Sequence, residues 1–269
     1  MTSRTRALTV VLAATTVFSA TASANELRLD PVTDSVTIAT GALFTLSIEA
    51  LSRGKELRPQ EPGDEDDLFF LDRSVVRGSS ADLTGDRFLS DALYVAAFAA
   101  GIFKPVLTGL EEGAEQGWID LALYAESAAI NGAITELVKI AVRRPRPIAY
   151  IRVREGTYDP ETNTALSFWS GHTSSVAAIG ATMTYLEFYR NRCTARPWIS
   201  LAAWALATAV TGVARVTSRN HFITDVIAGA AFGTGVGLLV PHLHRRASRI
   251  RPTAAVLDRG ATLGVAGEL

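Results

Sequence analysis

The chain has 269 residues and a formal net charge of −1 at pH 7, which allows one domain with a sizeable core. A near-neutral balance lacks the basic excess typical of nucleic-acid-binding domains, so we expect no nucleic-acid partner. The only cysteine, Cys193, excludes an internal disulfide and a cysteine-based metal cluster.

The first 24 residues have the pattern of a secretory signal peptide. Arg4 and Arg6 precede an apolar run from Ala7 to Ala20, and Ala22-Ser23-Ala24 forms an A-x-A cleavage site. We therefore predict that residues 1–24 direct export and are removed. The alternative is an uncleaved leader that stays as a membrane anchor.

Residues 25–87 are predicted to form one helix and a long polar loop. Val36–Leu51 has the composition of a helix, whereas Ser52–Arg87 is polar and rich in Gly, Pro and Asp. The acidic run Asp64–Asp67 lacks the alternating ligand spacing of an EF-hand, so we expect a solvated loop and no calcium site there. Leu71–Val75 (LDRSV) resembles a stretch that recurs before the helical domain in exported bacterial proteins.

Residues 88–243 are predicted to form an all-α catalytic domain, a bundle with five or six core helices. The expected helices are Phe88–Leu110, Trp118–Val142, Gly171–Tyr189, Trp198–Val213 and Phe222–His242. Pro145 and Pro147 should end the second of these. Residues 244–269 form a basic segment and a tail, in which Asp258-Arg259-Gly260 between apolar stretches predicts a small hairpin.

Three short blocks in the second half of the chain gather the residues that can carry chemistry. In chain order they are Lys139-x6-Arg146-Pro147, Ser170-Gly171-His172 and Arg215-x5-His221-x3-Asp225. Together they hold three cations, two histidines, one carboxylate and a glycine turn. Such a set suits a phosphate ester, because phosphoryl transfer depends mostly on positioning and on the stabilisation of negative charge.

The cations and the glycine turn can hold an anion in complementary ways. The planar forks of Arg146 and Arg215 match phosphate oxygens bidentately, and Lys139 adds a point charge. Ser170 is a good N-cap for the apolar helix that follows, and Gly171 lets the backbone approach a ligand. The first N–H groups of that helix would then point at the anion.

The third block places a histidine and a carboxylate on one face of a helix. His221 and Asp225 are four residues apart, so the carboxylate can fix the imidazole tautomer and stabilise the charged ring. This arrangement suits a histidine nucleophile. It leaves His172 free to act as general acid and base.

The three blocks resemble the signature of the type 2 phosphatidic acid phosphatase (PAP2) superfamily, which includes bacterial acid phosphatases and vanadium haloperoxidases. The family pattern is K-x6-R-P, P-S-G-H and S-R-x5-H-x3-D, and this chain has KIAVRRPRP, FWSGHTS and ARVTSRNHFITD. The resemblance implies that His221 attacks phosphorus to form a phosphohistidine, that Asp225 orients His221 and that His172 protonates the leaving group. It implies phosphate-binding roles for Lys139, Arg146, Ser170, Gly171 and Arg215. It implies no metal and no other cofactor for a phosphatase.

A few residues in and near the blocks depart from the family pattern or lie outside it. Trp169 replaces the usual proline and Ala214 the usual serine, and Trp169 bears on the helix entry and on the substrate mouth. Arg143 and Arg144 match no family position, so we expect solvated or headgroup-facing charges. The two histidines of the PHLHRR segment, His242 and His244, are expected to be surface groups.

The helices suit either a membrane-embedded or a soluble bundle. A membrane span needs about 20 mainly apolar residues. Trp198–Val213 and Val226–Val240 carry no charge and meet the composition of a span. The two helices within 88–142 carry several charges, which favours a soluble bundle. Five spans, with Val36–Leu51 outside the membrane, put all three blocks on one side. The opposite side then receives Arg190, Arg192 and Arg196, as cytoplasmic loops require. We expect a membrane-embedded bundle; a soluble periplasmic bundle is the alternative.

The sequence therefore predicts a metal-independent phosphatase of the bacterial inner membrane with a periplasm-facing site. Its substrate would be a phosphorylated lipid, such as a phosphate monoester or pyrophosphate, and the lipid bilayer its surroundings. A soluble bundle would instead suit small phosphoesters, as a non-specific acid phosphatase. A vanadate-dependent haloperoxidase and a non-catalytic membrane scaffold are the remaining alternatives.

Overall fold

In the computed structural model of the chain, the described residues are 27–53, 60–80, 86–160, 164, 166–245, 250–257 and 260–267. The predicted signal peptide lies outside these residues. The chain divides into two compact units, one of which is Arg28–His244 and the other of which contains the C-terminal strands. The first unit carries all three sequence blocks.

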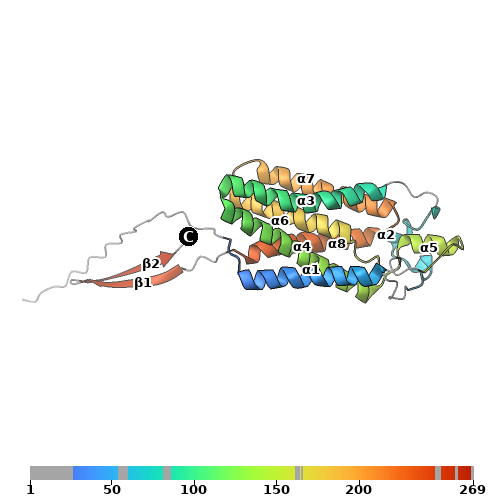
Figure 1. Cartoon of the computed structure of the whole chain (residues 1–269), viewed down its shortest axis with the longest axis horizontal. Helices are drawn as coiled ribbons and strands as arrows, with labels where there is room; N and C mark the ends of the chain where they lie inside the picture. The colour runs from blue at the N-terminus through green and yellow to red at the C-terminus, as the bar shows by residue number, and fades with distance from the viewer. Residues whose placement is uncertain are drawn as a thin grey trace, which may run out of the picture. The chain divides into compact units, whose positions relative to one another are not determined.

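The first unit is an all-α bundle of long helices, as the sequence predicts (Figure 1). The long helices are α1 (Pro31–Arg53), α3 (Asp86–Glu112), α4 (Ala114–Val142), α6 (Gly171–Asn191), α7 (Arg196–Thr217) and α8 (Ile223–Leu243). Each predicted helix is found, with ends that extend a few residues further. The shorter α5 (Pro147–Arg154) was not predicted, because Pro147 was interpreted only as a helix stop. Proline is also well placed at the first position of a new helix.

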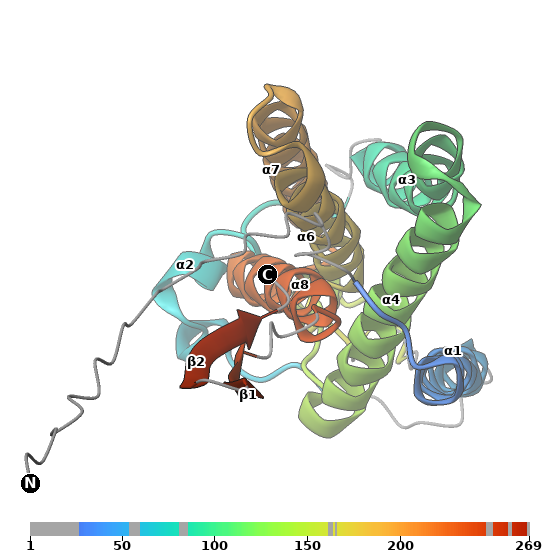
Figure 2. The ribbon, with the colours of Figure 1, turned by 90° about the vertical axis from the view of Figure 1, so that its left-hand side faces the viewer.

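Helix α6 packs against α3, α4, α7 and α8, and α1 packs against α4. Seen from the end of the bundle, α1 lies on the outer side of α4 (Figure 2). Small residues allow the closest of these contacts, between α6 and α8. A Cβ atom at Gly233 would lie 2.0 Å from the carbonyl oxygen of Ser174, and one at Gly237 would lie 2.2 Å from that of Ala178. Only glycine permits two helices to approach this closely.

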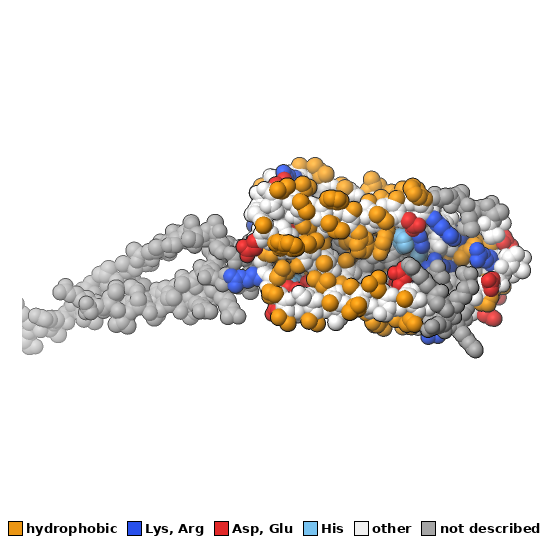
Figure 3. Space-filling model, in the orientation of Figure 1, with side chains coloured by type: hydrophobic (Ala, Val, Ile, Leu, Met, Phe, Trp, Pro, Cys, Tyr) orange, Lys and Arg blue, Asp and Glu red, His pale blue; other side chains and the backbone are white. Residues whose placement is uncertain are grey.

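Within the described residues, four helices are long and apolar enough to cross a membrane: Pro31–Ser52, Arg87–Glu112, Arg196–Thr217 and Ile223–Leu243. Large apolar side chains stay exposed along them, among them Phe103, Leu206 and Ile227. Figure 3 shows hydrophobic side chains spread along one side of the bundle. So much exposed apolar surface suits lipid rather than water. The chain is a membrane protein.

Two of the expectations about individual spans need correction. The stretch Val36–Leu51 was placed outside the membrane, yet α1 is one of the four candidate spans. Helix α3 was interpreted as a buried helix of a soluble bundle because of its charges. One of these, Lys104, lies 2.6 Å from Glu187 of α6. Paired in this way, a charge inside an apolar helix is compatible with a membrane protein.

The segment predicted as a long, mostly irregular loop is more ordered than expected in its described part, residues 60–80. It contains the 3-10 helix η1 (Glu65–Asp67) and the short helix α2 (Phe70–Arg73). Val75 and Val76 are buried and pack with Tyr150 and Phe222 in one apolar cluster. The segment therefore covers the end of the bundle where α8 begins.

The second unit contains a two-stranded antiparallel hairpin, which confirms the predicted hairpin near the C-terminus. Strand β1 (Ile250–Leu257) pairs with β2 (Gly260–Gly267) in a register from Ile250 opposite Gly267 to Leu257 opposite Gly260. The intervening Asp258 and Arg259 lie outside the described residues.

Candidate active site

The three sequence blocks meet at one end of the bundle, where α4 and α7 end and α6 and α8 begin. The backbone N–H of Ser170 donates to the carbonyl oxygen of Asp225 over 3.1 Å, which joins the second block to the third. The N–H of Ile148, just after the first block, donates to the carbonyl oxygen of Arg219 over 3.2 Å. Residues far apart in the sequence thus share one backbone framework.

Two arginines lie beside each other in this framework. Arg146 Nη1 donates to Asn220 Oδ1 over 3.1 Å, and the carbonyl oxygen of Arg215 accepts from the backbone N–H groups of Asn220 and His221. Burial, together with the neighbouring charges of Arg215 and Arg87, lowers the pKa of Arg146 to about 9. With this pKa Arg146 remains charged at neutral pH, so Arg146 and Arg215 bring two neighbouring cations to the site.

Lys139 and the glycine turn form the next part of the site. A Cβ atom at Gly171 would lie 3.2 Å from Lys139 Nζ, so glycine gives the lysine room against the turn. Lys139 Nζ also contacts Glu136 Oε1 at 2.6 Å. Ser170 is the N-cap of α6: its hydroxyl accepts from the backbone N–H of Thr173 over 3.4 Å. The capped start of α6 therefore lies next to a third cation.

His221 is almost fully buried, at 2% exposure, in the turn between α7 and α8. Its Nδ1 lies 2.7 Å from the carbonyl oxygen of Ser167, and because a carbonyl only accepts, Nδ1 carries the proton. Burial lowers the pKa of His221 to about 3, and the charges of Arg146 and Arg215 act in the same direction, whereas Asp225 opposes them. The ring is therefore neutral at neutral pH, with its lone pair on Nε2.

Asp225 lies close to His221 but makes its hydrogen bonds elsewhere. Its Oδ2 is 3.8 Å from His221 Nδ1, a distance of an ion pair rather than of a hydrogen bond. The same oxygen accepts from the Ser167 hydroxyl at 2.5 Å and from the backbone N–H of Phe222 at 2.9 Å. Ser167 thus contacts both members of the pair, His221 with its carbonyl and Asp225 with its hydroxyl. No motif position pointed to it.

Arg144 is the clearest correction to the sequence interpretation, which expected a solvated charge. Its Nη1 lies 2.6 Å from Asp225 Oδ1 and its Nη2 lies 2.8 Å from Asp72 Oδ2. Its guanidinium carbon also lies 4.0 Å from the centre of the Phe222 ring. Although burial opposes it, these two carboxylates raise the pKa of Arg144 above its ordinary value. Arg144 is a fixed, charged link between the start of α8 and the segment before α3.

Asp72 is fully buried, at 0% exposure, and completes this link. Besides Arg144 it accepts from the hydroxyl of Thr224 at 2.6 Å and from the Thr224 backbone N–H at 3.1 Å. It belongs to the Leu71–Val75 stretch, which was noted in the sequence without a role for any single residue. An acidic residue directly after the apolar Phe69-Phe70-Leu71 was the signal available there.

His172 occupies the second position of α6 and is half-buried. Its Nε2 lies 3.0 Å from Asp91 Oδ1 of α3, and its ring lies 4.6 Å, centre to centre, from the ring of Tyr94. Arg215 Nη1 lies 3.3 Å from the same Asp91 oxygen. Asp91 therefore joins His172 to the cation cluster. In the sequence it was considered only as a charge that interrupts an apolar helix.

The two departures from the family pattern have ordinary packing roles. Trp169 Nε1 donates to Thr135 Oγ1 over 2.9 Å, and the indole stacks 4.4 Å from the Phe232 ring. Ala214 is buried in the last turns of α7. Trp169 thus lies between α4 and α8, next to the turn that begins α6.

Comparisons with known proteins agree with the resemblance seen in the blocks. The family model described as the PAP2 superfamily matches residues 120–249. Two proteins named lipid A 1-phosphatase are similar to the chain: one from Rhizobium etli, 32% identical over 131 residues (48% of this chain, 52% of that protein), and one from Porphyromonas gingivalis, 39% identical over 84 residues (31% and 18%). The chain spans about half or less of the length of these relatives.

A solved structure is also similar: the first transmembrane PAP2 type phosphatidylglycerolphosphate phosphatase, from Bacillus subtilis. It is 19% identical, with a TM-score of 0.37 over 79% of this chain and 94% of that one.

Proposed function

Because the PAP2 superfamily model matches residues 120–249, we propose that the chain is a membrane phosphatase that releases phosphate from a lipid phosphate or pyrophosphate. One observation carries the proposal. A buried, neutral histidine, His221, has its Nδ1 proton fixed by a backbone carbonyl and lies in the field of Arg146 and Arg215. A lone pair in a cationic site is what attack on a bound phosphate requires.

The reaction proceeds in two displacements. Lys139, Arg146 and Arg215, with the start of α6, hold the phosphoryl oxygens. His221 Nε2 forms a bond to phosphorus as the bond to the ester oxygen breaks, and His172 gives its proton to that oxygen. His172 then takes a proton from water, the resulting hydroxide oxygen attacks the phosphohistidine, and inorganic phosphate leaves as His221 is restored.

The acidic groups support these steps without touching phosphorus. As His221 bonds to phosphorus its ring gains positive charge, which Asp225 stabilises from 3.8 Å. Arg144 and Ser167 hold Asp225 in place. Burial and the charge of Arg215 lower the pKa of His172 to about 4, whereas Asp91 acts in the opposite direction and favours the protonated form that serves as the acid. The positive charge at the reaction centre comes from side chains, so we expect catalysis to need no metal there.

The substrate class follows from the surroundings of the site. Apolar side chains are exposed along the bundle, so a substrate anchored in lipid reaches the site from the membrane. The relatives from Rhizobium etli and Porphyromonas gingivalis are named lipid A 1-phosphatases, which makes lipid A the first substrate to test. Phosphatidic acid, phosphatidylglycerol phosphate and isoprenyl pyrophosphates are the next.

We propose further that the site faces the periplasm of a bacterial inner membrane. The end of α6, the start of α7 and the turn between them lie at the opposite end of these helices from the site. They carry Arg190, Arg192 and Arg196, as a cytoplasmic connection should. With α1 as an additional span, residues 28–30 also lie at this arginine-rich end. If residues 1–24 direct export, residues 28–30 would instead lie in the periplasm and the site in the cytoplasm. The sidedness therefore needs a direct test.

The chain offers its own probe of sidedness. Cys193 is exposed and lies in the α6–α7 turn. In intact spheroplasts a membrane-impermeant maleimide should leave Cys193 unlabelled and should label it after lysis. The matched variant Cys193→Ser with Thr157→Cys, a substitution of an exposed residue after α5, should be labelled without lysis. The opposite pattern would place the site in the cytoplasm.

The activity is tested by phosphate release from purified protein in detergent, against lipid phosphates and small soluble esters in parallel. We expect turnover of a lipid ester, competitive inhibition by vanadate, which mimics five-coordinate phosphorus, and unchanged initial rates after brief treatment with a chelator. Activity lost to the chelator and restored by a divalent ion at the reaction centre would contradict the mechanism. Faster turnover of small soluble esters than of any lipid would contradict the substrate class.

A further inference from the structure

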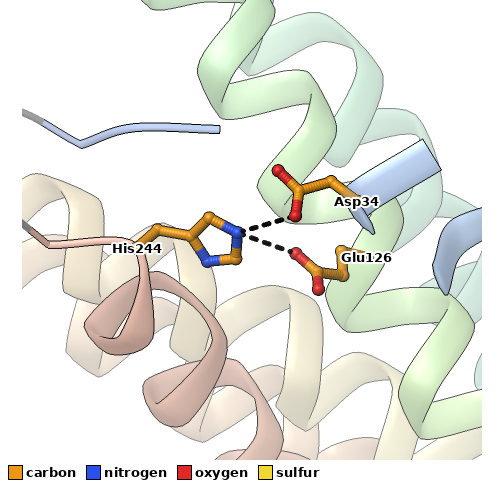
Figure 4. A group of neighbouring side chains, drawn as sticks. All are labelled: Asp34, Glu126 and His244. Carbon is orange, nitrogen blue, oxygen red and sulfur yellow. Dashed lines mark hydrogen bonds and ion pairs between the residues drawn. The ribbon is translucent and has the colours of Figure 1, made fainter. Parts of the chain in front are cut away.

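A second cluster of ionisable side chains lies at the far end of α8. His244, the residue after α8, meets Asp34 from the first turn of α1 and Glu126 from α4 (Figure 4). Its Nε2 lies 3.3 Å from Asp34 Oδ1 and 3.3 Å from Glu126 Oε2. The sequence interpretation took His244 as a surface group, which is wrong. The side chains of Asp34 and Glu126 are 9% and 10% exposed, and that of His244 is 13% exposed.

A hydrogen bond at Nδ1 determines the tautomer of His244, and so determines that Nε2 carries the lone pair of the neutral ring. Nδ1 lies 2.8 Å from the carbonyl oxygen of Val240, so Nδ1 carries a proton. In the neutral ring, Nε2 then points a lone pair at two carboxylate oxygens. Three lone pairs facing one another repel, and buried carboxylates need a positive partner.

A second proton on the ring would satisfy only one of these oxygens. The N–H at Nε2 makes a single strong hydrogen bond, and Asp34 Oδ1 is its hydrogen-bond partner. Glu126 Oε2 is inaccessible to solvent and has no hydrogen-bond donor among the described residues. Each of these problems disappears if a divalent cation lies among the three atoms.

We propose that Asp34, Glu126 and His244 form a binding site for a divalent transition-metal ion, with zinc the best match. Tetrahedral ligands about 2.0 Å from zinc lie about 3.3 Å from each other, which matches the separation of Nε2 from each carboxylate oxygen. The two carboxylates carry a charge of −2, which offsets the +2 charge of the ion, while the imidazole is neutral. Both kinds of group are ligands that zinc accepts. Water would complete the coordination.

The groups around the ligands hold them in the required orientation. Val240 fixes the tautomer of His244, and the backbone N–H of Asp30 donates to Asp34 Oδ2 over 2.8 Å, which leaves Oδ1 for the ion. Metal sites depend on such outer hydrogen bonds. Because the ligands come from α1, α4 and the end of α8, the ion would fasten α1 to the bundle. Its role is structural, and it does not rest on the proposed phosphatase activity.

The test is the metal content and melting temperature of the full-length protein in detergent. After chelation and gel filtration, zinc alone is added back and the bound metal is counted. We expect one tightly bound zinc per chain in the wild type and a higher melting temperature with zinc than without. His244→Ala and the isosteric Glu126→Gln should lose both the bound ion and the zinc-dependent shift.

His242 supplies the matched control, because it lies two residues earlier, is exposed, and contacts Tyr185 rather than the cluster. His242→Ala should bind zinc as the wild type does. A wild type that binds no zinc after reloading would overturn the proposal. So would zinc bound equally by the wild type and by Glu126→Gln. Cobalt added in place of zinc gives a second reading, since visible absorption bands of tetrahedral cobalt should appear in the wild type and be absent in Glu126→Gln.

Discussion

The two ends of α8 carry histidines with the same local anchor and opposite surroundings. His221 before the helix and His244 after it each have Nδ1 within hydrogen-bond distance of a backbone carbonyl, that of Ser167 or that of Val240. Each therefore presents Nε2 as the free nitrogen. Near His221 lie the charges of Arg146 and Arg215, with Asp225 3.8 Å from Nδ1, whereas His244 Nε2 meets two carboxylates.

This difference shows that the neighbours, and not the residue type, decide what a histidine can do. A lone pair among cations is ready to bond to the phosphorus of an anion. A lone pair among carboxylates is ready to bind a cation. Helix α8, 21 residues and about 31 Å long, keeps the two environments apart, so that the charges of one end have little effect on the other.

The largest expected effect is the loss of activity on replacing His221, compared with His242, an exposed histidine in the last turn of α8. His221→Ala should lower phosphate release to the uncatalysed background, because no other group in the site supplies the nucleophile. His242→Ala should keep wild-type turnover. Both variants are compared by phosphate release, with melting temperatures to show that they are folded. Near-wild-type turnover of His221→Ala would remove His221 from the mechanism.

His172 should have a smaller effect that depends on the leaving group. General acid catalysis contributes about 10²–10⁴-fold, so His172→Ala should lose that much on a lipid ester, whose alcohol is a poor leaving group. An activated aryl phosphate needs less protonation and should keep part of the rate. The ratio of kcat values for the two substrates is the measurement. Equal losses on both would indicate phosphate binding rather than acid catalysis.

Replacing Arg144 tests whether the carboxylates of Asp72 and Asp225 depend on its positive charge. Arg144→Ala leaves the buried carboxylates of Asp72 and Asp225 without their partner, which costs about 3–5 kcal/mol in comparable buried pairs. We expect a lower melting temperature and a reduced kcat with little change in KM. Arg143→Asn is the matched neighbour, since Arg143 has a φ of 48° that asparagine tolerates. Equal effects of both substitutions would refute the role of Arg144.

The smallest effect is on stability as a function of pH. The pKa of His221 is about 3 in the folded protein and 6.5 is its ordinary value, so between these values the unfolded chain binds more protons. The contribution of His221 is therefore fully present above pH 6.5 and decreases as the pH falls towards 3. From pH 7 to pH 5 the melting temperature of His221→Gln should fall less than that of the wild type or of His242→Gln. Parallel slopes would show that His221 is not buried in its neutral form.

The sequence was sufficient for what depends on local pattern. The apolar periodicity of the long helices and the spacing of the three blocks indicated both the bundle and the residues that meet at its end. The contacts of Arg144 with Asp72, and of His244 with Asp34 and Glu126, join residues from distant helices. No local pattern encodes such pairings. Arg144 and His244 each stand in a run of basic residues, where a solvated charge is the ordinary expectation.

The sequence also could not show whether His221 Nδ1 donates its hydrogen bond to Asp225 or to Ser167. The four-residue spacing of His221 and Asp225 predicts a shared helical face, but His221 lies in the turn before α8 begins. Its ring therefore turns to the carbonyl of Ser167 rather than directly to the carboxylate. A backbone acceptor leaves no trace in the residue type, so only coordinates can identify it.

The central claim, that His221 becomes covalently phosphorylated, has a direct test. Wild-type protein is mixed with a lipid substrate radiolabelled in its phosphate, quenched by denaturation at high pH, and analysed for label that stays on the protein. The account predicts label that withstands alkali, is released by mild acid as from a phosphohistidine, maps to His221 and is absent from His221→Ala. Rapid phosphate release by the wild type with label on another residue, or with equal label on His221→Ala, would contradict it.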